Sequence, residues 1–186
     1  RRIHFVKGIE GNEDAEERYR AYVDTLTKHG IPVVQERISQ GDFYVTGAER
    51  AAKEILRSNL AFPEAIVCAN DITAITICDI LVENGYKVPE DVVVSGYDYT
   101  MEGMYHTPRI TTVRCRFKQL GIEACKVLLD AAEGKKIPDK VQLPDEVILE
   151  ESCGCHGRRS VDESNRDKQY VSADILQRIF IHHMLI

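Results

Sequence analysis

Short apolar runs alternate with amphipathic segments along the first hundred residues of the chain. The runs at 3–6, 33–38, 65–69 and 92–95 predict buried strands, which start roughly thirty residues apart. Between the runs, apolar residues recur at helical spacing. Parallel strands joined by right-handed helical crossovers produce such a pattern, so we expect an α/β fold with a doubly wound parallel sheet.

Three helices are predicted between these strands. Asn12 is a favourable N-cap for the first, whose apolar face comprises Tyr19, Tyr22, Val23 and Leu26 and which Gly30 ends. The second has an apolar face formed by Val45, Ala48, Ala52, Ile55 and Leu56. The third covers about 72–83 and ends at Asn84-Gly85.

The pattern changes after Asp98. Residues 99–108 are irregular, 111–113 are extended, an amphipathic helix covers 117–131 before Gly134, and a strand is expected at 147–149. These pieces have no obvious place in the first sheet. We expect them to belong to a second domain whose other strands are absent. A further amphipathic helix is predicted within 171–186.

Composition narrows the function classes. The net charge of 24 − 30 = −6 argues against binding of a phosphate backbone by this part alone. No apolar run approaches membrane-spanning length, so we expect no membrane partner. Most of the six cysteines lie in apolar patterns, which favours buried thiols and a cytoplasmic location. Because the chain opens on Arg1 with a strand following at once, we expect a fragment of a longer protein.

Polar residues end each predicted strand, and in a doubly wound sheet these ends meet at one edge, where ligands bind. The four loops there are 8–12, 39–43, 70–71 and 97–99. Carboxylate, carboxamide and aromatic groups suit a small polyhydroxylated or heterocyclic ligand. The alternatives are ordinary ones: Asn70 and Asp71 as helix caps, Asp98 as a turn residue, and Phe43 as core.

Several motifs then resemble a known family. They are 65–74 with Asn70-Asp71, 85–92, Ser95-Gly-Tyr-Asp98, 108–113 and Ser152-Cys-Gly154. In this order they resemble the effector-binding domain of the lac-repressor and galactose-repressor family, over about residues 1–155. The resemblance implies a type I periplasmic-binding-protein fold, in which two α/β subdomains flank a cleft. It implies that 1–110 form the C-terminal subdomain, that 111–155 are crossover elements of an incomplete N-terminal subdomain, and that 156–186 are a linker and helix leading to a possible output domain.

The resemblance also implies the ligand-binding residues. The family's sugar- or purine-binding residues correspond to Arg18, Phe43, Asn70 and Asp98. Asp71, Tyr99 and Cys115 are possible additional cleft residues. The sequence departs from the family pattern at Ala21, Thr76 and Tyr99, and Arg18 is open to the alternative of a charge on a solvated helix face.

The function implied is ligand sensing by a transcriptional regulator, with allosteric control of DNA binding. DNA contact is expected only through a domain absent here, and a homodimer is expected through the helix near 72–82 and the loop near 100–106. Two alternatives remain. One is a sensor with a C-terminal output domain, such as a diguanylate cyclase, a kinase or a DNA-binding module, and the other is an exported sugar-binding protein of a transporter. No catalytic or phosphate-binding motif is present, and Cys153-Gly-Cys155-His156 lacks common zinc spacing, so we expect no enzyme activity, cofactor or metal.

Overall fold

Four parallel strands form the centre of the molecule. The structure is a computed structural model that describes residues 1–155. The strands are β1 (Ile3–Val6), β2 (Ile38–Ser39), β3 (Ala65–Cys68) and β4 (Val93–Ser95), in the order β2-β1-β3-β4. Their pairs run in parallel, with Ile3 opposite Ala65 and Ala65 opposite Val93. All four carboxyl ends therefore lie along one edge of the sheet.

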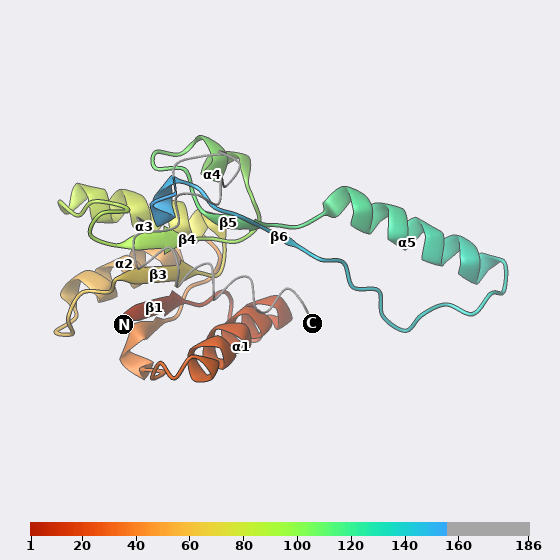
Figure 1. The fold of residues 1–186 in the computed structure, drawn as a ribbon, viewed down its shortest axis with the longest axis horizontal. Coiled ribbons are helices and arrows are strands. Elements are labelled where there is room, and N and C mark those ends of the chain that lie inside the picture. Colours follow the sequence, from red (N-terminus) through yellow and green to blue (C-terminus); the bar gives the residue numbers. More distant parts are fainter. Residues whose placement is uncertain (156–186) are drawn as a thin grey trace, which may run out of the picture.

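Helices cover both faces of this sheet (Figure 1). On one face, α1 (Glu13–Lys28) packs Tyr22 and Leu26 against Phe5 and Val67. On the other face lie α2 (Val45–Arg57) and α3 (Asp71–Glu83), which bury a cluster that includes Ile66 and Val94. The alternation of strand side chains between two buried clusters explains why the runs are apolar throughout. The predicted doubly wound α/β fold is confirmed.

Most predicted elements are present at or near their expected bounds. Asn12 caps α1, because its side chain accepts a hydrogen bond from the Ala15 amide at 3.0 Å. Ala48, Ala52 and Ile55 are buried as expected. Val45 was also expected on the buried face, but it is 50% exposed. It is the first residue of α2, and the buried residues of this helix begin at Gly47.

Two local predictions were wrong. The second strand does not cover 33–38, since a 3-10 turn occupies Gln35–Arg37 and the ladder with β1 begins at Ile38. The turn is associated with a buried Arg37, whose guanidinium donates to the Ala61 carbonyl at 2.8 Å. The segment 99–108 is not irregular throughout, because it contains the short helix α4 (Met101–Tyr105), capped by the side chain of Thr100.

The later elements extend away from this body. β5 (Thr112–Arg114) and β6 (Glu146–Ile148) form an antiparallel pair, and the segment between them carries α5 (Phe117–Ala132), which projects outward (Figure 1). A bridge between Ser95 and Thr111 joins the start of this pair to the main sheet. The prediction that these pieces have no place in the first sheet therefore holds beyond that bridge.

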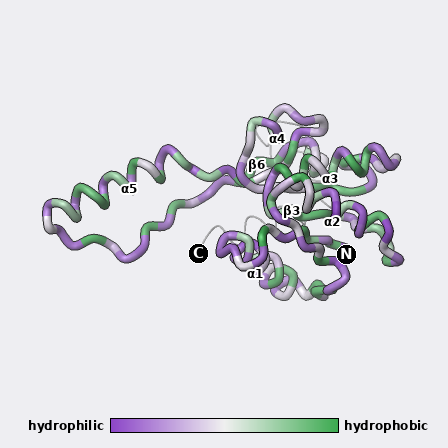
Figure 2. The backbone as a smooth tube through the Cα atoms, turned by 180° about the vertical axis from the view of Figure 1, so that it is seen from behind, coloured by the Kyte–Doolittle hydropathy of each residue, from purple (hydrophilic) through white to green (hydrophobic). Residues whose placement is uncertain are grey.

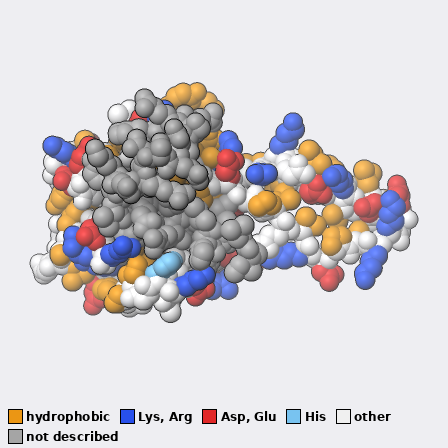
Figure 3. Space-filling view, in the orientation of Figure 1, with side chains coloured by type: hydrophobic (Ala, Val, Ile, Leu, Met, Phe, Trp, Pro, Cys, Tyr) orange, Lys and Arg blue, Asp and Glu red, His pale blue; other side chains and the backbone are white. Residues whose placement is uncertain are grey.

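No residue of α5 is buried. Apolar and polar stretches alternate along it (Figure 2), and apolar side chains lie between charged ones on the surface of the projecting segment (Figure 3). The exposed large apolar residues of α5 are Phe117, Leu120, Ile122, Leu128 and Leu129. An amphipathic helix without a covered face is typical of an element that packs against another part of a protein.

Two further expectations concern other parts of the chain. The helix predicted within 171–186 and the linker at 156–186 lie outside the described residues. Within residues 1–155, no helix combines the length and the apolar character needed to cross a bilayer.

The contrast between the body and α5 gives a first prediction. Leu81 is fully buried in α3, whereas Leu128 on α5 is 69% exposed. We expect Leu81→Ala to lower the free energy of unfolding by about 2–5 kcal/mol, since truncation removes buried contacts and leaves a cavity. The same change at Leu128 should cost less than about 0.5 kcal/mol. Urea unfolding monitored by circular dichroism measures both, and an equal loss at the two positions would show that α5 packs as tightly as the core.

Candidate functional site

Arg18 lies at the centre of the carboxyl edge of the sheet. Its Nη1 donates to the Ala69 carbonyl at 2.7 Å, at the end of β3. Its Nη2 lies 3.8 Å from Oδ1 of Asp98, which follows β4. Asn12 starts α1 in the loop after β1, so that Arg18 projects from the second turn of α1 over the neighbouring strand ends. Three loops therefore meet at one guanidinium, and the interpretation of Arg18 as a solvated surface charge is wrong.

Aromatic rings flank the same guanidinium. The Arg18 Cζ lies 3.9 Å from the centroid of the Tyr97 ring and 5.6 Å from that of Phe43. Both distances are within the range of cation–π attraction. Phe43 is half-buried, and its ring occupies the space that a side chain on Gly8 would fill, since a Cβ there would lie 2.2 Å from it. The structure thus brings Arg18, Phe43 and Asp98 together.

Asn70 has two partners within the protein. Its Oδ1 accepts from the Thr73 amide at 3.1 Å and caps α3, and its Nδ2 donates to the Phe43 carbonyl at 2.9 Å. The helix-cap interpretation is confirmed. Asn70 also holds the loop that presents Phe43, so it lies beside the other candidate residues although it is only 6% exposed.

Backbone strain concentrates in these loops. Within residues 1–155, the non-glycine residues with positive φ are Phe43 (69°), Asp98 (113°) and Tyr99 (58°). Such conformations cost roughly 1–3 kcal/mol each and persist where the surroundings enforce them, often at functional sites. At Asp98 and Tyr99 the following strand holds this conformation: the Asp98 amide donates to the Val113 carbonyl at 3.1 Å, and the Tyr99 amide donates to Thr112 Oγ1 at 3.2 Å.

Asp71 lies behind the site. It is fully buried, its Oδ1 accepts from Thr112 Oγ1 at 2.6 Å, and its Oδ2 accepts from the Thr100 amide at 2.8 Å. Gly96 makes this approach possible, because a Cβ there would lie 2.3 Å from Asp71 Oδ1. Asp71 therefore positions the loop that carries Asp98 and offers no surface to a ligand.

Burial raises the pKa of both aspartates. It raises the pKa of Asp71 to about 6, against the hydrogen bonds from Thr112 and Thr100, which favour the carboxylate. The pKa of Asp98 is also raised, chiefly by burial, while the nearby Arg18 cation opposes that shift. Both aspartates lie at the carboxyl edge of the sheet, but their exposure differs. Asp71 is fully buried, whereas the Asp98 side chain is 37% exposed.

Tyr99 and Cys115 lie at the side of the site nearest β5 and β6. Arg114 lies over the Tyr99 ring at 5.1 Å, and the Cys115 thiol donates to the Tyr97 hydroxyl at 3.7 Å. Burial raises the pKa of the Cys115 thiol, so the thiol is neutral near pH 7. Tyr97 itself was missing from the candidate residues, and the signal for it was an aromatic directly before the acid at the end of a strand.

We next consider whether any side chains could bind a metal ion. In the described range, no group of three His, Cys, Asp or Glu side chains is arranged to hold a metal ion. Cys153 and Cys155 are free thiols, and His156 of the same motif lies outside the described residues.

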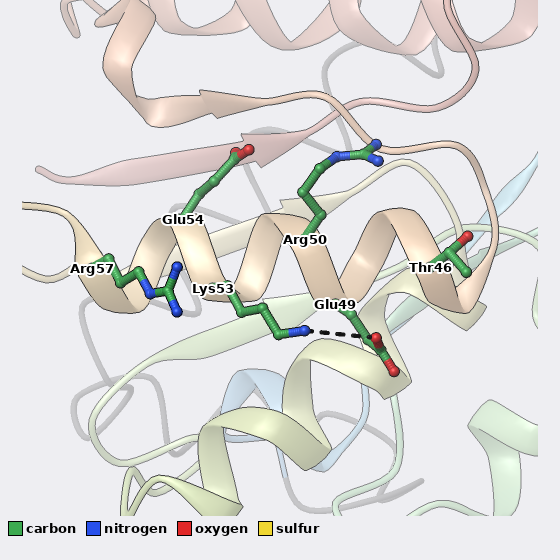
Figure 4. A pocket seen from close by; sticks show the side chains of 6 residues that line it. All are labelled: Thr46, Glu49, Arg50, Lys53, Glu54 and Arg57. Carbon is green, nitrogen blue, oxygen red and sulfur yellow. Dashed lines mark ion pairs between the residues drawn. The ribbon is translucent and has the colours of Figure 1, made fainter.

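A hollow of about 460 Å³ lies elsewhere, along the outer face of α2 (Figure 4). Only α2 lines it, with Thr46, Glu49, Arg50, Lys53, Glu54 and Arg57. Glu49 and Lys53, one turn apart on this helix, form an ion pair at 3.8 Å (Figure 4). A single solvated helix face of mixed charge lacks the converging walls of a small-molecule site, so we assign no ligand to it.

Comparison with known proteins identifies relatives. Residues 1–153 match the family model described as "Periplasmic binding protein-like domain". The HTH-type transcriptional repressor PurR of Actinobacillus pleuropneumoniae is 29% identical over 155 residues, covering 82% of this chain and 44% of the relative. The HTH-type transcriptional regulator GalR of Escherichia coli is 30% identical over 138 residues, covering 74% of this chain and 40% of the relative.

Solved structures show the same similarity. A transcriptional regulator CelR in complex with cellobiose has a TM-score of 0.75 and 27% identity, over 82% of this chain and 46% of that one. A sugar-binding regulator of the LacI family from Escherichia coli, complexed with phosphate, has a TM-score of 0.75 and 26% identity, over 81% of this chain and 54% of that one. The chain spans less than half the length of the PurR and GalR relatives above.

The raised pKa of Asp71 gives a prediction about stability and pH. The folded protein binds this proton more tightly than the unfolded chain does, so the contribution of Asp71 to stability is fully present below its ordinary pKa of 3.8. That contribution is lost as the pH rises through about 6. Asp71→Asn keeps one acceptor for Thr100 and removes the titration. Relative to the variant, wild type should lose about 2 kcal/mol of unfolding free energy between pH 4 and pH 7, most of the full effect of this shift.

Urea unfolding across that pH range, for wild type and variant, provides the measurement. The exposed Asp139→Asn is the matched control and should leave the wild-type slope unchanged. Parallel slopes for wild type and Asp71→Asn would show that Asp71 does not hold its proton in the folded protein.

Proposed function

The chain belongs to the family of periplasmic binding protein-like domains, and we propose that it is the effector-sensing part of a LacI-type transcriptional regulator. In this proposal a small effector binds at the carboxyl edge, with Arg18, Phe43, Asn70 and Asp98 as the principal residues and Tyr99 and Cys115 at the side. Asp71 supports them from behind. The relatives named above are transcriptional repressors and regulators, which favours regulation over enzymatic activity.

One observation carries the proposal: a cation, a carboxylate and two aromatic rings converge where four strands end. The 3.8 Å separation of Arg18 and Asp98 is longer than a direct hydrogen bond, so both groups keep capacity for other partners. Phe43 and Tyr97 supply flat apolar surfaces. Strained backbone at Phe43 and Asp98 is a further mark of a site whose geometry serves a ligand.

The effector class follows from these groups. Asp98 can accept hydrogen bonds from hydroxyl or amino groups, Arg18 can donate to oxygens or ring nitrogens, and the rings suit a sugar face or a heterocycle. The similar regulator CelR was solved with cellobiose, which supports a sugar effector, and the flanking aromatic rings support a purine-like heterocycle as the other candidate.

Sensing requires a second wall and an output. We propose that residues 1–110 form one wall of the cleft and that 111–155 belong to the opposing subdomain, which the uncovered α5 supports. An effector that binds the closed arrangement more tightly shifts the population toward it, and such coupling is typically about 1–3 kcal/mol. DNA contact would come from a part of the protein outside these residues, and the location would be cytoplasmic.

Binding measurements test the site directly. In the full-length regulator, titration calorimetry with cellobiose, D-galactose, hypoxanthine and guanine should identify one binding compound. Arg18→Ala and Asp98→Ala should each weaken that compound about 10- to 150-fold, since a hydrogen bond to a charged group is worth about 1.5–3 kcal/mol. Arg20→Ala is the matched control, because Arg20 lies on the same helix but is exposed. Unchanged affinity in both site variants would refute the assignment.

We also propose that two copies associate through α3 and α4. These helices pack against each other and expose Ile72, Val82, Met101 and Tyr105, the last at 80%. His106 links the end of α4 to α3, because its Nε2 lies 2.9 Å from Asp79 Oδ1. This face coincides with the helix near 72–82 and the loop near 100–106 that the family resemblance assigns to a homodimer.

Multi-angle light scattering tests the dimer. Wild type should have twice the 21.1 kDa mass of one chain. The double variant Ile72→Asp/Tyr105→Asp should have the mass of one chain, because two carboxylates would be desolvated at the contact. Leu128→Asp, on the exposed face of α5, should remain a dimer. A dimer that is lost only in Leu128→Asp would place the contact on α5 instead.

A further inference from the structure

We propose that Tyr97 is a positioning residue that couples the effector site to the two strands leading to α5. Its ring supports Arg18, and its hydroxyl joins both strands. The meaning of this coupling for regulation rests on the proposed function, whereas the link itself is a property of the described residues.

The hydroxyl contacts both ends of the projecting segment. Cys115 directly follows β5, and Asp145 directly precedes β6. The Tyr97 hydroxyl donates to Asp145 Oδ2 at 2.8 Å and accepts from the Cys115 thiol at 3.7 Å. One side chain at the end of β4 therefore touches the chain where it leaves the body and where it returns.

The direction of the Asp145 hydrogen bond follows from chemistry. Burial, followed by the hydrogen bond to Asp145, raises the pKa of Tyr97 above its usual range, so the phenol keeps its proton. A carboxylate can only accept, and the phenol is its donor. Phenylalanine at this position would keep the ring and lose both contacts.

The ring faces the site. The Arg18 Cζ lies 3.9 Å from its centroid, and the same guanidinium reaches Asp98 and the Ala69 carbonyl. A ligand that binds Arg18 therefore contacts a guanidinium that is stacked on the Tyr97 ring. The path from the site to the outer strands thus has two steps, Arg18 to the ring and the hydroxyl to Cys115 and Asp145.

Tyr97 lies where the outer segment between β5 and β6 joins the rest of the protein. α5 has no buried residue, and β5 and β6 pair with each other, so the outer segment is held at its base. The Tyr97 loop is itself tied to β5 and to the residue before it. The Asp98 amide donates to the Val113 carbonyl in β5, and the Gly96 amide donates to the Thr111 carbonyl at 2.8 Å. A small shift of Tyr97 is therefore passed to the base of the outer segment.

Amide hydrogen exchange of the full 186-residue chain, followed by mass spectrometry without any effector, tests the link. Tyr97→Phe should raise exchange in 112–116 and 145–149 by about threefold or more, with no change in β3. Arg18→Met should raise exchange in the same two segments, although the hydrogen bond and the ion pair of Arg18 go to Ala69 and Asp98, outside both segments. In the double variant the increase should equal that of Tyr97→Phe alone, because the link is already cut.

Two controls separate coupling from general loss of stability. Tyr22→Phe removes another buried tyrosine hydroxyl, which donates to the Ile3 carbonyl at 3.1 Å, and should leave the two segments unchanged relative to β3. Asp145→Asn keeps an acceptor for Tyr97 and should behave as wild type, whereas Asp145→Ala should resemble Tyr97→Phe.

Two outcomes would overturn the proposal. In one, Arg18→Met leaves both segments unchanged, so that Tyr97 is only a local clamp. In the other, the effects of Tyr97→Phe and Arg18→Met add in the double variant. Because exchange is measured without effector, unchanged effector affinity in Arg18→Ala and Asp98→Ala would refute the proposed site and would not alter this result.

Discussion

The buried carboxylate of Asp71 holds the carboxyl edge of the sheet together. Its two oxygens receive hydrogen bonds from Thr112 on β5 and from the amide of Thr100, and its own amide donates to the Tyr97 carbonyl. Asp71 thus joins the start of α3 to the loop after β4 and to β5. Taking a carboxylate out of water is costly, and these donors offset part of that cost.

The loop held in this way can carry strain. Asp98 and Tyr99 adopt positive φ because Asp71 fixes Thr100 on one side and β5 receives the amides of Asp98 and Tyr99 on the other. Gly96 is required at the start of the loop, because any side chain there would strike Asp71. The acid that cannot touch a ligand therefore determines where the exposed acid, Asp98, points.

Sequence patterns predicted the parts of the fold that depend on burial alone. The runs that became β1, β3 and β4 are apolar because both faces of each strand are covered. β2 was misplaced because Gln35–Arg37 form a 3-10 turn, in which Arg37 is buried and donates a hydrogen bond to the distant Ala61 carbonyl. Periodicity contains no information about such a partner. The short α4 was missed for a related reason, since five residues are too few to show a helical period.

In the candidate site, too, local sequence patterns predicted some residues and missed those that depend on distant partners. Strand ends located Arg18, Phe43, Asn70 and Asp98 near one another, because parallel strands bring their carboxyl ends to one edge. The roles of Asp71 and Tyr97 depend on contacts across 41 and 48 positions of the chain, to Thr112 and Asp145. Long-range pairing of this kind follows from the fold as a whole and has no local signature.

Exposure at the site constrains how an effector could be held. The side chains of Arg18 and Asp98 remain 22% and 37% exposed, and they lie on one side of a single sheet edge. A ligand placed there would bury one face and leave the other in water, where competing hydrogen bonds weaken each polar contact. Tight binding therefore requires an opposing surface. The uncovered apolar face of α5 requires one too, and β5 and β6 connect these two incomplete surfaces, with Tyr97 at their base.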